Sequence, residues 1–210
     1  VKGAINSLEV AKELEIENYI LASSSEVYQE PDVLPTPESV KILIPDILNP
    51  RYSYAGGKII SEILTINYLR ETSIKHMIFR PHNVFGPKMG FEHVIPQIIE
   101  KVFKDSKGFR TDSCSIKIQG NGNETRAFCF VEDAIEQLMF IFSNGQNGNI
   151  YHIGMNNEIT ISELISDISK ILKISISFDG GLVIKGATNR RCPDIKKIQD
   201  LGNTKKNNYH

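Results

Sequence analysis

The sequence predicts an α/β fold built around a doubly wound parallel sheet, and two observations support this prediction. Helical and strand patterns alternate through the first part of the chain at the spacing of consecutive strand–helix units. Polar clusters follow the apolar strand patterns directly, at the carboxyl ends where such sheets bind ligands. The fold class therefore already indicates where a functional site would lie.

The composition is that of an ordinary globular protein and argues against two classes of partner. Of the 210 residues, 40% are hydrophobic and 23% are charged, both within the usual range. The 24 basic and 25 acidic residues leave a net charge of −1, so we expect no nucleic-acid partner. The apolar runs are far shorter than the about 20 residues that cross a bilayer, so we expect no membrane segment.

The three cysteines predict neither a disulfide framework nor a metal site. Cys114, Cys129 and Cys192 are widely separated and lack the CxxC spacing of zinc and redox sites. A chain of this length does not need disulfides for stability, so free thiols in a reducing compartment are the simplest interpretation. We therefore expect a cytoplasmic protein without a bound metal.

The first two helices and strands are predicted from their periodicity. Residues 4–14 place apolar side chains on one helical face, and residues 19–22 form the short apolar run of a buried parallel strand. After a proline-rich loop, a second helix is predicted over residues 54–69, and a strand follows over residues 77–79. The apolar surface of the second helix is assigned to Ile59, Ile60, Ile63, Leu64 and Ile66.

The second half of the chain mixes further helices and strands. We predict helices over residues 95–102, from residue 132 onward and over residues 161–172, and strands over residues 115–119, 127–131, 151–153 and 174–178. The last of these helices begins with the capping box Thr160-Ile161-Ser162-Glu163. Residues 203–210 lack a core pattern and are expected to be frayed. The helix after residue 132 is expected to turn these side chains inward: Ile135, Leu138, Met139 and Phe142.

Tyr54 and Lys58, at the start of the second helix, are the first candidate site residues. Their i, i+4 spacing places both side chains on one helical face. A free tyrosine is too weak a base at neutral pH, but a nearby ammonium favours the phenolate, which makes a usable general base. Alone the spacing is weak, because any such pair on a helix surface matches it.

Two further polar motifs strengthen this interpretation. The first, Ser23-Ser24-Ser25-Glu26-Val27-Tyr28, follows the strand upstream of the helix. The second, Arg80-Pro81-His82-Asn83-Val84-Phe85-Gly86-Pro87, follows the strand downstream of it. In a parallel sheet these strand ends lie at one edge, so we expect the three motifs to line one crevice.

In these motifs the sequence resembles the NAD-dependent epimerase/dehydratase family, a nucleotide-sugar-modifying branch of the extended short-chain dehydrogenase/reductase superfamily. The resemblance extends from about Gly3 to Leu201. Five motifs carry it in the family's order: Ser-Ser-Ser-Glu-Val-Tyr, Tyr-x-x-x-Lys, Arg-Pro-His-Asn-Val-Phe-Gly-Pro, Gly-Asn-Gly-Asn-Glu-Thr-Arg-Ala-Phe and Arg-Cys-Pro-Asp.

The resemblance implies an incomplete Rossmann-like doubly wound parallel sheet with a smaller C-terminal substrate-binding α/β domain. Residues 1–90 would form the C-terminal part of the NAD-binding Rossmann domain. Residues 91–210 would form mainly the substrate-binding domain, with residues 126–143 returning to the Rossmann domain. The resemblance also implies a homodimer that pairs the helices over residues 4–14 and 54–69.

The resemblance assigns roles to individual residues as well. Tyr54 would be the catalytic base that takes a sugar hydroxyl proton as hydride leaves for nicotinamide. Lys58 would assist Tyr54 and hold the nicotinamide ribose, Ser24 would hydrogen-bond the reacting hydroxyl, and Glu26 would be a further catalytic acid. Tyr54, Lys58 and Pro81 would bind the cofactor. The substrate, a nucleotide-diphosphate sugar, would be bound by Ser25, Asn83, Arg126 and Arg191.

Asn83 would contact the diphosphate of this substrate, and Arg126 would bind a phosphate. Arginine suits an oxyanion because it can make two parallel charge-assisted hydrogen bonds. His82 is interpreted as a shaped filler of the site rather than as a base.

The resemblance leaves three functions open. The leading one is an NAD-dependent nucleotide-sugar epimerase or dehydratase, and the second is a UDP-glucuronate-type decarboxylase. Ser-Ser-Glu, ending at Glu26, resembles the Thr-Ser-Glu of the decarboxylases and of GDP-mannose dehydratases. Gly56-Gly57, His82 and Gln29 depart from the decarboxylase pattern. The third alternative is a non-catalytic nucleotide-sugar-binding module.

The sequence contains no glycine-rich turn of the kind that cradles a dinucleotide pyrophosphate at a helix N-terminus. Val1-Lys2-Gly3 is interpreted as a start within a helix, so the resemblance implies a preceding segment that carries this turn. We expect the chain by itself to be inactive, poorly soluble and without measurable NAD binding. The expected cofactor is NAD. NADP stays open as an alternative, because the residue that selects between the two would lie in that preceding segment.

Overall fold

The computed structural model describes residues 1–182 and 186–202, so the predicted frayed end at residues 203–210 lies outside the described residues. Helices and strands alternate along the chain as expected. In order they are α1 (Lys2–Glu13), β1 (Asn18–Ala22), η1 (Ser25–Tyr28), η2 (Pro50–Tyr52), α2 (Ser53–Leu69), β2 (Lys75–Pro81), β3 (Val84–Phe85), α3 (Val94–Asp105), β4 (Ser113–Lys117), β5 (Thr125–Ala127), β6 (Cys129–Phe130), α4 (Val131–Asn144), β7 (Asn149–Ile153), β8 (Glu158–Thr160), α5 (Ile161–Leu172), β9 (Ser175–Asp179), β10 (Arg190–Arg191) and α6 (Lys196–Asp200).

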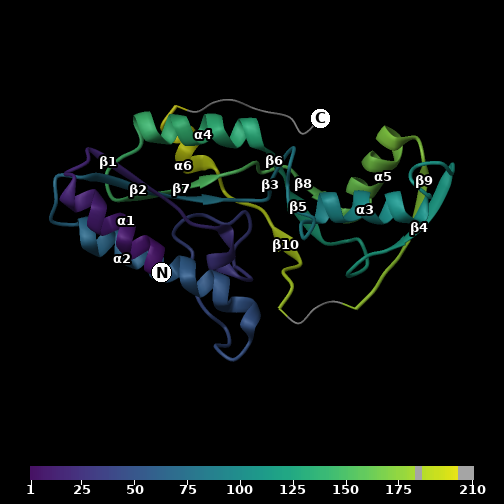
Figure 1. Ribbon diagram of the computed structural model, residues 1–210, viewed down its shortest axis with the longest axis horizontal. Helices are drawn as coiled ribbons and strands as arrows, with labels where there is room; N and C mark the ends of the chain where they lie inside the picture. The colour runs from purple at the N-terminus through teal and green to yellow at the C-terminus, as the bar shows by residue number, and fades with distance from the viewer. Residues whose placement is uncertain (183–185, 203–210) are drawn as a thin grey trace.

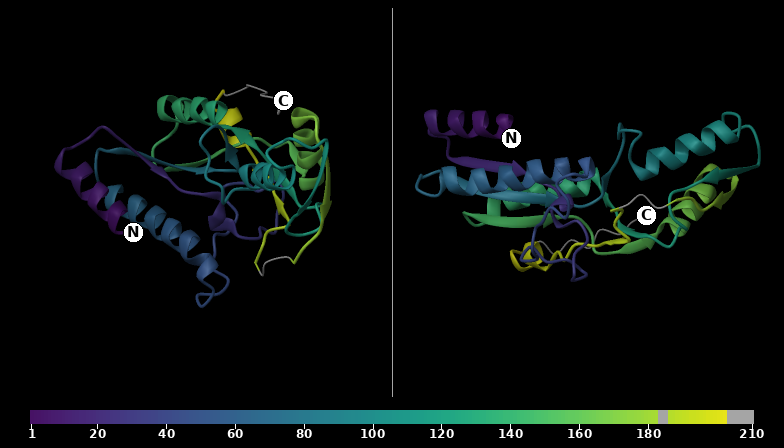
Figure 2. Two further views of the ribbon diagram at one scale, coloured as in Figure 1. Left: turned by 45° about the vertical axis from the view of Figure 1, so that its right-hand side comes forward. Right: turned by 90° about the horizontal axis from the view of Figure 1, so that it is seen from below.

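A parallel three-stranded sheet in the order β1-β2-β7 forms the centre of the larger half. Helices α1 and α2 lie on one face of this sheet, and α4 and α6 lie on the other (Figures 1 and 2). Side chains alternate between the two faces, as the pleat requires. Tyr19 packs with the α1 and α2 side chains, whereas its neighbour Ile20 packs with the α4 side chains. The predicted α/β fold with parallel strands is confirmed.

The smaller half is built on a parallel pair of strands, β4 and β9, with α3 and α5 packed beside it (Figure 1). Strands β10, β5 and β8 form a second small sheet, and β3 pairs with β6. The predicted single strand over residues 127–131 is wrong. The chain changes sheets at the buried Phe128, so β5 pairs with β8 and β10, β6 pairs with β3, and Val131 begins α4.

Helix α2 buries a polar face and exposes part of its apolar surface. Glu62 and Thr65 are 2% and 0% exposed, whereas Ile60 and Ile63 are 45% and 52% exposed. The partners of Glu62 are Ser23, which directly follows β1, and Arg80 on β2, so the polar face turns toward the sheet. Of the residues assigned to the apolar surface of this helix, Ile60 and Ile63 are therefore exposed in the described chain and do not face the sheet.

Helix α4 shows the same kind of difference. Ala134 and Ile141 are buried against β2 and β7, and Leu138 is partly buried with them. The prediction that the other three apolar side chains point inward is wrong, because the opposite face of the helix carries Ile135, Met139 and Phe142, which are all exposed.

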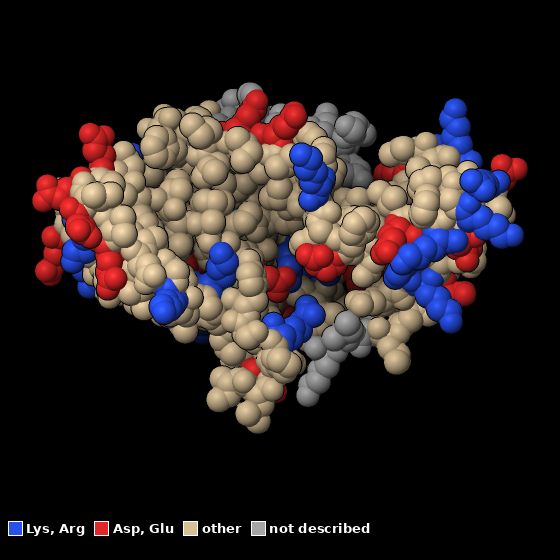
Figure 3. Space-filling view, in the orientation of Figure 1, with Lys and Arg blue, Asp and Glu red and all other residues tan. Residues whose placement is uncertain are grey.

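Basic and acidic side chains are interspersed on the face in Figure 3, without a broad basic area. Within residues 1–182 and 186–202, the helices are too short or too polar to cross a bilayer. In the same ranges no group of three or more His, Cys, Asp or Glu side chains is placed to hold a metal ion.

The capping box at the start of α5 is formed as predicted, and replacing Thr160 with alanine should destabilise the protein. The Thr160 Oγ1 accepts a hydrogen bond of 3.0 Å from the Glu163 amide, and the Glu163 carboxylate accepts one of 2.7 Å from the Thr160 amide. We expect Thr160→Ala to lower the free energy of unfolding by about 1 kcal/mol, measured by urea unfolding. The exposed substitution Lys170→Ala on the same helix is the control, and an equal loss in both variants would contradict the capping role.

Candidate functional site

Lys58 and Tyr54 lie over the carboxyl end of β1. The Lys58 Nζ donates a 2.7 Å hydrogen bond to the carbonyl of Ala22, the last residue of that strand. The same Nζ lies 5.7 Å from the centroid of the Tyr54 ring, which is 56% exposed. The structure therefore brings the predicted pair together at a strand end, with the tyrosine open to a ligand.

The predicted residues Ser24, Ser25 and Glu26 follow β1 immediately. Ser24 is the N-cap of η1, and its Oγ accepts a 3.2 Å hydrogen bond from the Glu26 amide. Ser24 and Ser25 are 8% and 5% exposed. Because the cap uses Ser24 as an acceptor, its hydroxyl proton is left to donate to another group.

Glu26 reaches across to the C-terminal part of the chain. Its carboxylate forms an ion pair with the Arg191 guanidinium, which also donates a 3.1 Å hydrogen bond to the Thr188 Oγ1. The Thr188 carbonyl in turn accepts a 2.8 Å hydrogen bond from Arg126. Arg191 and Arg126 are register partners in the pairing of β10 with β5. The predicted acid and both predicted arginines are thus neighbours.

Asn83 and Pro81 lie at the carboxyl end of β2. Pro81 is the last residue of the strand and is paired in register with Ile153. Asn83 has a positive φ of 41°, and its side-chain amide donates a 3.1 Å hydrogen bond to the carbonyl of Ala127. Ala127 directly follows Arg126, so Asn83 is connected to the arginines.

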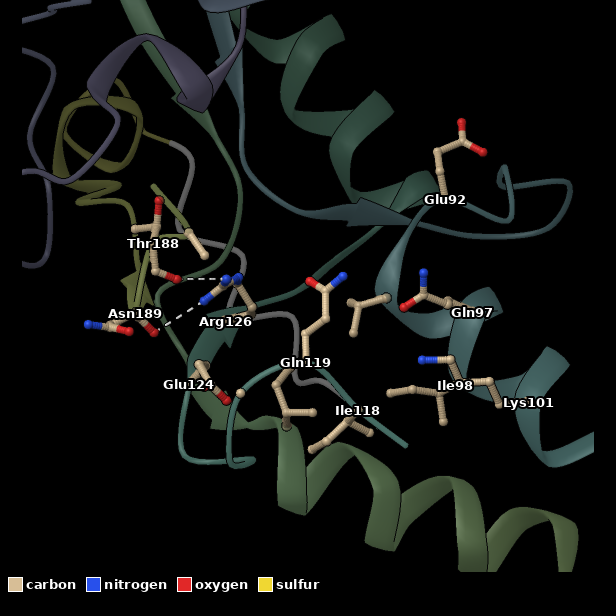
Figure 4. A pocket seen from close by; sticks show the side chains of 14 residues that line it. Glu92, Gln97, Ile98, Lys101, Ile118, Gln119, Glu124, Arg126, Thr188 and Asn189 are labelled. Carbon is tan, nitrogen blue, oxygen red and sulfur yellow. Dashed lines mark hydrogen bonds between the residues drawn. The ribbon is translucent and has the colours of Figure 1, made fainter. Parts of the chain in front are cut away.

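A cavity of about 210 Å³ opens beside Arg126 (Figure 4). Sequence reasoning assigned Arg126 alone of the residues that line it. The glycine-rich turn Gly120-Asn121-Gly122 was the sequence signal that could have pointed to this cavity. In the structure its amides donate hydrogen bonds of 3.2 and 3.0 Å to the carboxylate of Glu124, which lines the cavity. Gly120 and Gly122 both have positive φ, which favours glycine. The polar side chains lining the cavity are Glu92, Gln97, Lys101, Gln119, Glu124, Arg126, Thr188 and Asn189.

The electrostatics of the two arginines favour an anionic ligand. Burial, and to a smaller extent the nearby positive charge of Arg191, lowers the pKa of Arg126 to about 10. The guanidinium group still carries its charge at pH 7. A bound anion would reduce the repulsion between the two guanidinium groups and replace water lost on burial.

A buried polar network that sequence reasoning missed lies beneath these residues. The Glu62 carboxylate accepts hydrogen bonds from Ser23 Oγ and from Arg80, at 2.9 and 2.6 Å for the two Arg80 nitrogens. Arg80 also donates to the Tyr28 hydroxyl, which lies 2.7 Å from His152 Nε2. Burial raises the pKa of Tyr28 to about 12, so this hydroxyl stays protonated at neutral pH.

His82 is buried beside this network, with its ring 4.6 Å from the ring of His152. Within the described part of the chain neither of its ring nitrogens has a hydrogen-bond partner. Burial lowers the pKa of His82 well below its usual value, and the charges of His152, Arg191 and Arg80 act in the same direction. Burial also lowers the pKa of His152, against an opposing effect of Glu38.

These two histidines should make the protein less stable in mild acid. Below about pH 6.5 the unfolded chain takes up protons that the folded protein excludes, which removes about 1 kcal/mol per pH unit for each proton. We expect the free energy of unfolding to be flat near pH 8 and to fall from pH 6.5 toward pH 5, measured by urea unfolding. His82→Phe fills the same space and should reduce this slope, whereas exposed His93→Gln should not; equal slopes would contradict the assignment.

The family model described as "NAD dependent epimerase/dehydratase family" matches residues 1–154 of this chain. Among curated proteins, the chain is 30% identical over 203 residues to UDP-glucuronic acid decarboxylase 6 of Arabidopsis thaliana, covering 96% of this chain and 56% of that protein. It is 32% identical over 210 residues to a putative UDP-glucose 4-epimerase of Methanocaldococcus jannaschii, covering 96% of this chain and 62% of that protein. The chain therefore spans little more than half the length of these relatives.

A solved structure has the same fold at lower identity. The UDP-N-acetylglucosamine 4-epimerase of Methanobrevibacter ruminantium M1, in complex with UDP-N-acetylmuramic acid, superposes with a TM-score of 0.83 at 22% identity. The match covers 96% of this chain and 62% of the other. At this identity the likeness establishes the fold alone.

Proposed function

Because this chain belongs to the NAD dependent epimerase/dehydratase family, we propose that the protein is an NAD-dependent nucleotide-sugar epimerase or dehydratase acting by transient hydride transfer at the sugar ring. The observation that carries the proposal is the placement of Lys58 and Tyr54. The Lys58 ammonium is bonded to the carbonyl of Ala22, which lies two residues before Ser24 at the end of β1. The exposed Tyr54 ring lies beside this ammonium. A base, its charged partner and a hydroxyl donor thus converge on one strand end.

The described residues fit the nicotinamide end of NAD. Lys58 keeps two of its three N–H donors beyond the bond to Ala22, which suits ribose hydroxyls. Within the described ranges no glycine-rich turn joins a strand to a helix at this sheet, so the pyrophosphate cradle is not assigned to these residues. When bound, the nicotinamide ring supplies a hydride acceptor that can later return the hydride.

The chain's own residues provide the proton transfer in this proposal. The Lys58 charge stabilises the phenolate form of Tyr54, and the phenolate oxygen accepts the proton of the reacting sugar hydroxyl and becomes a neutral phenol. The Ser24 hydroxyl donates a hydrogen bond to the same sugar oxygen, because the η1 cap uses this hydroxyl only as an acceptor.

Arg126 and Arg191 would hold the diphosphate of the nucleotide sugar. Their proximity and burial favour an anion, and the cavity beside Arg126 offers room for the nucleoside. Asn83, whose side chain is bonded to the carbonyl of Ala127, the residue after Arg126, would contact the same diphosphate. The proposed incomplete Rossmann domain would hold the cofactor, and the smaller C-terminal domain would hold this part of the substrate.

A nucleotide-uronate decarboxylase is the second candidate, favoured by one contact. The Glu26–Arg191 ion pair places an acid and an arginine beside the reacting groups. A uronate carboxylate could compete with Glu26 for Arg191, after which oxidation of the ring would labilise the carboxylate. A plant UDP-glucuronic acid decarboxylase is among the relatives.

The two candidates can be separated with the natural protein at its natural length. The protein is incubated with NAD and either UDP-glucose or UDP-glucuronate, and the products are identified by NMR. A new sugar epimer or a dehydrated keto sugar supports the leading proposal, whereas carbon dioxide released from UDP-glucuronate supports decarboxylation. Tight binding of these substrates without turnover would instead favour a non-catalytic binding module.

We propose in addition that the protein is a homodimer formed through α1 and α2. These helices lie side by side, and their outer faces expose Val10, Leu14, Ile60 and Ile63. Such an apolar surface is typical of helix pairs that pack against a second copy. Sedimentation velocity would test the proposal, since Ile63→Glu should convert a dimer to monomers; a wild-type monomer would contradict it.

A further inference from the structure

We propose that Glu62 and Arg80 are positioning residues for the reaction, holding helix α2 in register over the ends of β1 and β2. This inference rests on the proposed function, because its kinetic consequence requires a reaction at Tyr54. The residues touch neither a substrate nor a cofactor in the proposal. They act through Lys58, one turn away on α2, and through Ser24, which follows the Glu62 partner Ser23 just beyond β1.

Two consecutive turns of α2 bind consecutive residues at the end of β1. Lys58 donates to the Ala22 carbonyl, and Glu62, four residues later, accepts from the Ser23 hydroxyl. Ser24 is the next residue along the chain. A shift of the helix by one residue would break both contacts, so Glu62 fixes where Lys58 lies relative to Ser24.

Arg80 connects the same carboxylate to the second strand. Its guanidinium binds Glu62 through two nitrogens, the planar two-point geometry that restricts rotation as well as distance. Both side chains are 2% exposed. Through its third nitrogen Arg80 donates a hydrogen bond to the Tyr28 hydroxyl. Tyr28 is the last residue of η1, and Ser25 and Glu26 are its first two residues. One ion pair therefore joins α2, β2, η1 and the residue that directly follows β1.

The buried polar face of α2 supports this role over a purely stabilising one. Glu62 and Thr65 of α2 are buried within the chain, whereas Ile60 and Ile63 lie on the exposed face assigned above to the dimer. Replacing a buried ion pair with apolar residues is often neutral or stabilising. The buried Glu62–Arg80 ion pair is therefore explained by the geometry that it imposes rather than by stability.

The test compares Glu62→Gln and the apolar double variant Glu62→Leu/Arg80→Met in the natural protein, with Glu100→Gln in the exposed pair with Lys104 as the matched control. Each protein is assayed at a temperature where circular dichroism shows it folded. We expect kcat to fall about 100-fold in both test variants, because displacements near 1 Å cost that much, with KM little changed. A folded double variant that keeps the wild-type kcat would overturn the proposal.

A second measurement does not depend on turnover. Acetic anhydride labels accessible lysine amines, and mass spectrometry follows each lysine of the 210-residue chain separately. If Glu62 and Arg80 hold α2 in place, Lys58 should be labelled several-fold faster in the test variants, while Lys12 and Lys101 are unchanged. Unchanged Lys58 labelling would refute the positioning role, whereas an inactive wild type with accelerated Lys58 labelling would refute only the proposed function.

Discussion

Tyr54→Phe is expected to lower kcat by about a hundred- to ten-thousand-fold, the contribution usual for general acid–base catalysis. Phenylalanine retains the ring that lies 5.7 Å from the Lys58 Nζ, so the local packing is preserved. Phenylalanine lacks the phenolic oxygen that accepts the sugar proton. Since only a step of the reaction is lost, the affinity for NAD should change little.

Steady-state kinetics and calorimetric NAD titration of the natural-length protein provide the measurement. Tyr19→Phe is the matched control, because it also removes one tyrosine hydroxyl. This hydroxyl is bonded to Ser7 at 2.8 Å, and Tyr19 lies near the opposite end of β1 from the site. Its kcat should equal that of the wild type. Wild-type turnover in Tyr54→Phe would eliminate the proposed base.

Arg80→Met should be the most destabilising single substitution considered for this protein. The change leaves the Glu62 carboxylate buried without its ion-pair partner, which typically costs about 3–5 kcal/mol. It also removes the donor to the Tyr28 hydroxyl. We expect urea unfolding of the chain to show a loss of this size, or no cooperative folded state at all.

Two variants define the cause of that loss. Lys104→Met breaks an exposed ion pair with Glu100 and should cost no more than about 1 kcal/mol. The double variant Glu62→Leu/Arg80→Met removes both charges and should recover most of the stability lost in Arg80→Met. If the double variant were no more stable than Arg80→Met, the loss would come from packing rather than from the unpaired carboxylate.

The fold was predictable wherever a long pattern coincided with a terminal signal. Helix α5 carries both an apolar stripe and a capping box, and it lies over Ile161–Leu172 as expected. Strands β3, β8 and β10 contain only two or three residues, too few to show alternation. Their pairing depends on partners distant in sequence, which local patterns do not contain.

The faces of the helices were less predictable than the helices themselves. Apolar residues occur on several sides of α2 and α4, so periodicity does not identify the buried side. In α2 the choice is made by Glu62, whose partner Arg80 lies 18 residues away on another element. A lone acidic residue on an apolar helix does not reveal such a partner.

The candidate site was predictable through its strand-end motifs, because parallel strands bring their carboxyl ends to one edge. Lys58 meets the end of β1, as that geometry suggests. The contact of Glu26 with Arg191 lies outside this sheet, because Arg191 is on β10, and Arg191 was assigned from the family resemblance. The cavity beside Arg126 was not predictable, since its wall combines α3, the glycine-rich turn and residues 187–189. The roles of the individual side chains stay predictions until the variants above are measured.

The contacts that close the site have a consequence for the order of folding. Tyr28 and His152 are separated by 124 residues, Gln29 and Thr188 by 159, and Glu26 and Arg191 by 165. Contacts between such distant residues carry the largest loop-closure entropy and slow the approach to the native state. During synthesis Glu26 leaves the ribosome long before Arg191 exists. The sheet of β1 and β2 can form early, but the side of the site that contains Glu26 and Arg191 is completed only after residue 191 has been synthesised.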